Sequence, residues 1–377
     1  MLSAVPALRR RGLLAAGAGA ALGAPLAWAQ PPAARPLVVA QLFDASPGEQ
    51  DVARDFLVGS RAAWQEINAR GGLRGRPVVH QAIEVDGGAA DLRRAWTELK
   101  DNPACVVLSG TVSDPLASRL AALLAQDNAG IAHAAPWLQN SSQEIDDSTF
   151  AIFAGRREQI AHALKSLALM GVQNAGAVFA TPRDHALYQA DVAQIAADLK
   201  LRLTAWQANG DLARLGQRLG PATPALLLFV GGTPELVQFT QGLDRQARQR
   251  YVIALADVNL QTVLQMGGGK TTSVIATQAV PMVSAALPVV RSYREALARL
   301  FDEPPVALSL AGYIAARYAY EVMNSIDGPL TRASVLAAFR RRTSLDVGGY
   351  RVAFDARRRS ATFVTQSMLT PDGRVVG

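Results

Sequence analysis

The stretch VVLSGTVSDPLASRLAALLA, Val106–Ala125, joins a short apolar run to a segment of helical periodicity through small hydroxyl residues. The apolar run fits a buried strand, and the spacing of the later apolar residues fits a helix that begins near Pro115. Because the first turn of a helix has free N–H groups and a partial positive charge, the loop at 110–114 suits a small anion such as a carboxylate. The charge of Asp114 opposes an anion, and ordinary helix capping by Ser113 or Asp114 is the alternative.

Apolar runs alternate with helical segments on both sides of this stretch. The repeat of roughly 25 to 35 residues is typical of parallel sheets covered by helices on both faces. About ten strands fall into two series, separated by DDSTFAIFAG at 146–155, and two lobes with a sheet each are favoured over one sheet of that size. The pattern then changes to three helices, at about 289–301, 306–326 and 330–341, followed by two short strands.

The first 29 residues have the features of an export signal. Three arginines at Arg9–Arg11 precede an apolar run at 12–26, and Ala27-Trp28-Ala29 forms a small-x-small cleavage pattern before Gln30. The run is too short and too rich in glycine for a convincing membrane span. The arginines fit a twin-arginine signal and an ordinary secretory signal equally well. Both predict a periplasmic protein.

Composition argues against nucleic-acid binding and against a disulfide framework. Removal of the signal takes away three arginines and no acidic residue, so the formal net charge falls from +7 to +4. Short basic runs such as RQARQRY have no aromatic interleaving, so solvated faces are expected rather than a nucleic-acid site. Cys105 is the only cysteine, and its apolar strand predicts a buried, inert thiol.

The sequence contains no pattern of residues for catalysis, a metal ion or a cofactor. MGGGKTTS resembles a phosphate-binding loop, but it lacks the glycine five positions before Gly269, and a strand follows it where a helix is needed. The four histidines are scattered without metal-ligand spacing, and no nucleophile elbow is present. We therefore expect no enzymatic activity. A catalytic set assembled only in space is the alternative.

The segment AWQEINARGGLRGRPVVHQAIEVDGG, Ala63–Gly88, resembles the region after the first helix of type I periplasmic binding proteins of the leucine/isoleucine/valine-binding branch. Its best local mark is Asn-x-x-Gly-Gly-x-x-Gly. The order of LSGTVSDPLAS, IAHAAPW, VGGTPELVQF, YVIALAD and ATQAVP extends the resemblance over almost the whole mature chain. The resemblance implies an α/β fold of two Rossmann-like lobes with parallel sheets, joined by three crossover segments, with a ligand cleft between the lobes.

Candidate crossovers lie near Phe153, Pro281 and Gly348. They divide the mature chain into two discontinuous lobes, with the first at 36–153 and 282–347 and the second at 154–281 and 348–377.

On the first lobe the resemblance implies seven residues that line the cleft: Phe43, Ser46, Thr111, Ser113, Ala134, Ala135 and Trp137. Thr111 and Ser113 would hold the ligand carboxylate. Pro136 stands where the family usually has a hydroxyl and an N–H donor, which weakens an amino-acid clamp. Trp137 would wall a larger apolar ligand, or it packs at the rim.

On the second lobe the implied residues are Asp184, Thr233 and Asp257. Asp257 would bind the ligand ammonium, with a helix N-cap as the alternative. Asp184 or His185 follows a strand, and Tyr188 lies further on. Thr233 takes a position where the family often has an aromatic residue.

These features predict the exported substrate-binding component of an ABC importer. It would capture a small amino acid or a related carboxylate or amide by lobe closure and deliver it, as a monomer, to an inner-membrane permease. A periplasmic sensor with the same cleft is the alternative from another class, and an enzyme on this scaffold is a further one.

Overall fold

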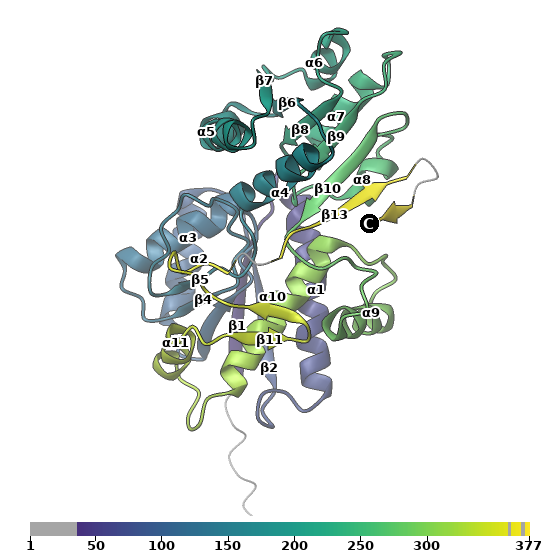
Figure 1. Ribbon diagram of the computed structural model, residues 1–377. Helices are drawn as coiled ribbons and strands as arrows, with labels where there is room; N and C mark the ends of the chain where they lie inside the picture. The colour runs from purple at the N-terminus through teal and green to yellow at the C-terminus, as the bar shows by residue number, and fades with distance from the viewer. Residues whose placement is uncertain (1–35, 361–362, 371–373) are drawn as a thin grey trace, which may run out of the picture. The chain divides into compact units, whose positions relative to one another are not determined.

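The structure is a computed structural model that describes residues 36–360, 363–370 and 374–377 (Figure 1). The export signal expected at 1–29 lies outside the described residues. None of the helices described is both long enough and apolar enough to span a membrane. The described strands form two large sheets and one small hairpin. We call each large sheet with its covering helices a lobe.

The first sheet has five parallel strands in the order β2-β1-β3-β4-β5. They are β1 (Leu37–Asp44), β2 (Val78–Val85), β3 (Cys105–Ser109), β4 (Ala132–Ala134) and β5 (Thr149–Phe150). In β1 the side chain of Val39 packs into the core on one face, and those of Val38 and Ala40 pack into the core on the other. Burial on both faces explains why β1 has a continuous apolar sequence.

Helices cover both faces of the first sheet (Figure 1). Helices α2 (Ala89–Asp101) and α3 (Asp114–Gln126) pack on one face; α1 (Gln50–Ala69), α9 (Pro288–Leu300), α10 (Ala307–Asn324) and α11 (Arg332–Arg340) share the core of the other. Glycines let α1 and α10 touch: a Cβ atom on Gly59 would lie 1.7 Å from the Ser309 oxygen, and one on Gly312 would lie 1.9 Å from the Phe56 oxygen.

The second sheet repeats this plan and extends it. Its parallel strands run in the order β7-β6-β8-β9-β10: β7 (Arg202–Gln207), β6 (Asn174–Phe179), β8 (Leu226–Val230), β9 (Tyr251–Ala254) and β10 (Ser273–Gln278). Two antiparallel strands, β13 (Thr365–Leu369) and β14 (Val375–Val376), continue the sheet beyond β10. The sheet expected to be parallel is therefore mixed at one edge.

Helices also cover both faces of the second sheet. Helices α4 (Arg156–Leu169) and α5 (Pro182–Asp198) pack on one face, and α6 (Leu212–Arg218), α7 (Thr233–Leu243) and α8 (Leu260–Gln265) pack on the other.

The chain passes between the lobes after β5, after β10 and again near its end. Phe153 and Pro281, two of the candidate crossover positions, lie in the first two passages. Gly348 does not lie in the third. It forms, with Gly349, the positive-φ turn between β11 (Leu345–Val347) and β12 (Tyr350–Val352), and both of these strands contribute to the core of the first lobe. The third passage lies between β12 and β13. The sequence did not locate it, because the apolar pattern of a short strand does not reveal which sheet the strand joins.

Candidate ligand cleft

A cavity of about 320 Å³ lies between the two lobes. Its lining comes mainly from the loops that follow β1 and β3 in the first lobe and β6 and β8 in the second. In each sheet these are the two neighbouring strands at which the strand order reverses. Open parallel sheets bind their ligands at this point, outside the carboxyl ends of the strands. The topology therefore brings two ligand-binding edges to one cavity.

Capping hydroxyl residues and first-turn prolines mark the helices that begin beside this cavity. Ser113, with a φ of 82°, accepts a hydrogen bond from the backbone N–H of Leu116 and caps α3. Thr181 caps α5 in the same way through the N–H of Asp184. Each of these helices, like α7, has a proline in its first turn, where the missing N–H costs nothing. The loops are thereby held close to the lobe interface.

Arg156, the first residue of α4, is the central cation of the cavity. One terminal nitrogen lies 2.9 Å from Asp184 Oδ1 and the other 2.5 Å from Asp257 Oδ2. The guanidinium carbon lies 4.8 Å from the centre of the Tyr188 ring. Burial opposes the charge of Arg156, but Asp257, Tyr188 and Asp184 outweigh it and raise the pKa of Arg156. Both aspartates therefore have a partner inside the protein.

Trp137 and Asn259 connect the lobes. Trp137 packs against Phe56 in the first lobe and donates its indole N–H to Asp257 Oδ1 at 2.8 Å in the second. The Asn259 amide at the start of α8 donates to Asp55 Oδ2 of α1 at 2.5 Å. These contacts join the lobes beside the cavity.

The sequence profile of the family described as periplasmic binding protein matches residues 36–369, nearly the whole described chain. The chain belongs to the periplasmic binding protein family. No curated protein matches it in sequence.

Three solved structures of low sequence identity have the same fold. An extracellular ligand-binding receptor from Verminephrobacter eiseniae ef01-2 has a TM-score of 0.83 and 18% identity, over 91% of this chain and 100% of that chain. A substrate-binding periplasmic protein from Ralstonia solanacearum has a TM-score of 0.80 and 19% identity, over 90% and 99%. A branched chain amino acid ABC transporter from Thermus thermophilus, with bound valine, has a TM-score of 0.78 and 14% identity, over 91% and 95%.

Three of the residues expected to bind ligand line the cavity of this periplasmic binding protein: Asp184, Thr233 and Asp257. Tyr188, which the sequence placed further along the same segment, also lines it. Asp257 does not cap α8, because Asn259 does so. The position of these residues follows from the rule that residues after parallel strands gather at one edge.

The remaining expected residues do not line the cavity: Phe43, Ser46, Thr111, Ser113, Ala134, Ala135 and Trp137. Thr111 is fully buried, and its hydroxyl lies 2.9 Å from His133 Nε2. Ser113 is fully buried and donates to Asp44 Oδ2 at 3.2 Å. Asp44 also accepts the backbone N–H of Ser46 at 2.9 Å. In this structure a carboxylate of the chain itself therefore occupies the loop in which the sequence predicted a ligand carboxylate.

Glu49, Arg156 and Arg183 line the cavity but were not expected there. Glu49 stands three residues after Ser46, just before α1, so a longer reading of the first loop would have found it. Burial and then the charge of Asp257 raise the pKa of Glu49 to about 8. Arg156 follows a crossover segment and not a strand. Its position in the cavity depends on how α4 packs, which no local sequence pattern predicts.

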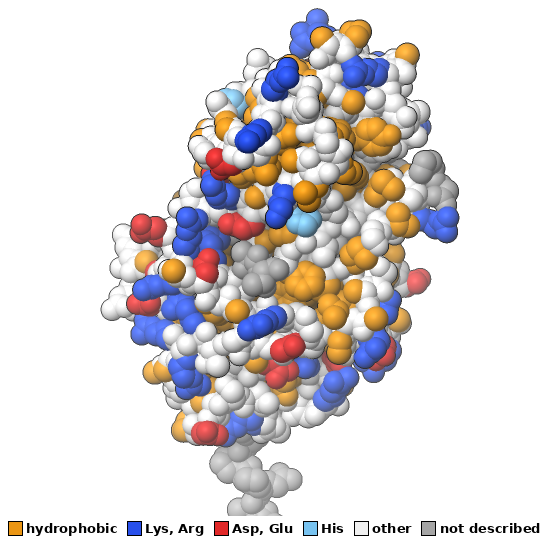
Figure 2. All heavy atoms as spheres, viewed as in Figure 1, with side chains coloured by type: hydrophobic (Ala, Val, Ile, Leu, Met, Phe, Trp, Pro, Cys, Tyr) orange, Lys and Arg blue, Asp and Glu red, His pale blue; other side chains and the backbone are white. Residues whose placement is uncertain are grey.

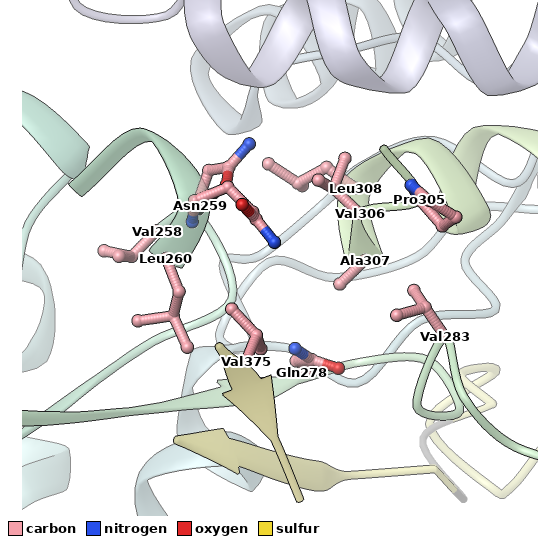
Figure 3. A pocket seen from close by; sticks show the side chains of 11 residues that line it. Val258, Asn259, Leu260, Gln278, Val283, Pro305, Val306, Ala307, Leu308 and Val375 are labelled. Carbon is pink, nitrogen blue, oxygen red and sulfur yellow. Dashed lines mark hydrogen bonds between the residues drawn. The ribbon is translucent and has the colours of Figure 1, made fainter. Parts of the chain in front are cut away.

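A second cavity, of about 100 Å³, also lies between the lobes (Figure 3). Val258, which precedes α8, and Leu260, its first residue, face Val306, which precedes α10, and Ala307, its first residue. Gln278 lies beside Val375. Its apolar lining contrasts with the charged lining of the larger cavity. The part of the chain that the structure describes contains no cluster of residues suited to a metal ion.

On the face shown in Figure 2, lysine and arginine side chains are dispersed among acidic and apolar ones. This face presents no continuous basic surface of the kind that holds a nucleic-acid backbone.

Proposed function

We propose that the chain is the exported solute-binding component of an ATP-driven importer. It captures a small amino acid or a related carboxylate or amide in the 320 Å³ cavity and delivers it, as a monomer, to an inner-membrane permease. The observation that carries this proposal is the cavity at the two points of strand-order reversal, in a chain of the periplasmic binding protein family. The valine-bound structure of the same fold supports a ligand of this size.

The proposed mechanism is closure of the lobes on the ligand. A ligand that touches both lobes stabilises the closed state by its additional contacts there. Trp137 and Asn259 already form bonds from lobe to lobe, so closure adds ligand contacts to an existing interface.

A thermal-shift screen of amino acids, aromatic acids, dicarboxylates, amides and amines identifies the ligand. A ligand at about 100 times its Kd adds roughly 2.7 kcal/mol of stability. X-ray scattering then compares the free and the ligand-saturated protein. We expect a smaller radius of gyration with ligand, and an unchanged radius with a confirmed ligand would contradict closure.

The proposed location is the periplasm, with cleavage before Gln30. N-terminal sequencing of the protein from a periplasmic extract tests it. Retention of Arg9–Arg11 in the mature protein would contradict this part of the proposal.

A further inference from the structure

The charged groups of the large cavity are out of balance. Six carboxylates and two guanidinium groups line it: Glu49, Asp51, Asp114, Asp184, Glu235, Asp257, Arg156 and Arg183. Arg156 already pairs with two carboxylates, and Arg183 lies 4.0 Å from Asp114. Among the described residues, Glu49, Asp51 and Glu235 form no ion pair. The pKa of Glu49 is raised to about 8, but even with Glu49 protonated the remaining carboxylates outnumber the two guanidinium groups. A cavity with surplus carboxylates concentrates cations and repels anions.

Among these three acidic residues is Glu49, whose pKa is raised by burial and by the charge of Asp257. It faces Asp44 at the end of β1, Asp114 at the start of α3, Arg156 at the start of α4 and Asp257 after β9. Three of these four neighbours are acidic, and Arg156 is shared with Asp184. Glu49 is therefore half-buried among negative charges without a cation of its own.

In the first lobe, the hydroxyl groups of the loop at 111–113 are not free to bind a ligand carboxylate. The hydroxyl of Ser113 donates to Asp44, and the hydroxyl of Thr111 pairs with His133. Asp114 Oδ1 takes the backbone N–H groups of Gln139 and Asn140, so this side chain adds an acceptor and no donor.

A second and independent feature points to a ligand. Tyr188 lines the cavity and is 2% exposed, yet its hydroxyl has no hydrogen-bond partner. The Nε atom of Arg156 is likewise buried without a partner. Because buried polar groups without partners are costly, these atoms suit a ligand with an uncharged hydrogen-bonding group.

We propose that the cavity takes a small organic cation, in which an ammonium group meets Glu49 and an uncharged amide or carbonyl meets Tyr188, with no free carboxylate. This inference rests on the proposed solute-binding function and narrows its ligand class to amines and amino amides. At about 30 Å³ for each water-sized group, a cavity of about 320 Å³ holds about ten non-hydrogen atoms.

Four probes of similar length and different charge test the ligand class by titration calorimetry on the mature protein: 5-aminopentanamide as cation, 5-aminopentanoate as zwitterion, pentanamide as neutral compound and glutaramate as anion. The titrations are run at about pH 9, because the pKa of Glu49 is about 8 and its carboxyl group is ionised only above that pH. We expect the cation to bind at least about tenfold more tightly than each of the others, as for a hydrogen bond to a charged group. Tighter binding of the zwitterion or the anion would overturn the inference and leave the solute-binding function intact.

Two variants test the contacts. Glu49→Gln should weaken binding of 5-aminopentanamide at least about tenfold, and Tyr188→Phe should weaken it less, because it removes a neutral hydrogen bond. Glu98→Gln makes the same chemical change at an exposed position of α2 and should leave affinity unchanged. Cation binding that is as tight in Glu49→Gln as in the wild type would overturn the assignment.

Failure of all four probes would overturn the inference. The broader screen under Proposed function separates that result from failure of the function. A different ligand that closes the lobes retains the function, and the absence of any such ligand contradicts both.

Discussion

At the scale of single residues, buried charge governs the cleft. The Arg156 side chain is 12% exposed and pairs with two carboxylates. Its neighbour Arg157 is 35% exposed and, within the described part of the chain, forms an ion pair with Asp191 alone. Removing one partner of a buried pair leaves an uncompensated charge, and removing a partner at the surface does not. The two adjacent arginines therefore differ in what they contribute.

Arg156→Met should lower the free energy of unfolding by about 3 kcal/mol, because Asp184 and Asp257 lose their partner. Arg157→Met, the matched control one residue along α4, should cost about 0 to 1 kcal/mol. Urea unfolding measures both. Equal losses in the two variants would show that Arg156 does not act as a buried ion-pair partner.

Glu49 gives the protein a specific pH dependence. Its pKa is raised from 4.5 to about 8 in the folded state, so the folded protein binds this proton more tightly than the unfolded chain. Stability from this group is therefore complete below about pH 4.5 and is lost as the pH rises towards 8. In Glu49→Gln that loss is absent.

The difference in unfolding free energy between Glu49→Gln and the wild type should accordingly be near zero at acid pH. It should grow in favour of the variant as the pH approaches 8 and then level off. Chemical denaturation across this range measures it. A difference independent of pH would contradict the raised pKa of Glu49.

At the scale of elements, the close contact between α1 and α10 depends on glycines, which have no side chain at the contact. Gly312 brings α10 against the Phe56 backbone, where a Cβ atom would lie 1.9 Å from an oxygen. Gly312→Ala must push the helices apart and should cost about 3 kcal/mol, as other overpacked cores do. Gly220→Ala is the control, because a Cβ atom there has nothing within 4 Å. Thermal unfolding of the two variants compares them, and a stable Gly312→Ala protein would contradict this packing.

Sequence pattern determined most elements correctly but not their partners. The three helices expected at about 289–301, 306–326 and 330–341 are α9, α10 and α11, with ends shifted by one or two residues. The strand within the segment IAHAAPW is only β4, Ala132–Ala134, because pairing with neighbouring strands and not propensity sets strand ends.

At the scale of the whole molecule, the proposed closure of the lobes predicts that hydrogen bonds from lobe to lobe favour the closed state. Trp137→Phe removes the indole N–H that reaches Asp257 in the other lobe. The free protein should then populate open states more and show a larger radius of gyration, with weaker ligand binding. Trp96→Phe removes a similar indole bond, to Asp127 at 2.9 Å, within one lobe and should leave the radius unchanged. If both variants keep the wild-type radius, the Trp137 bond does not hold the lobes together.

The sequence by itself determined the alternation of strands and helices, and hence which loops stand at the carboxyl ends of parallel strands. The family resemblance assigned Asp184, Thr233 and Asp257 to such loops, and all three line the cavity. Only the tertiary structure decided where their partners lie. Arg156 comes to Asp257 across 101 residues of chain, and Asp44 comes to Ser113 across 69. The pairing of charges depends on distance in space, which local periodicity does not encode. The surplus of acidic residues around the cavity therefore became visible only in the tertiary structure.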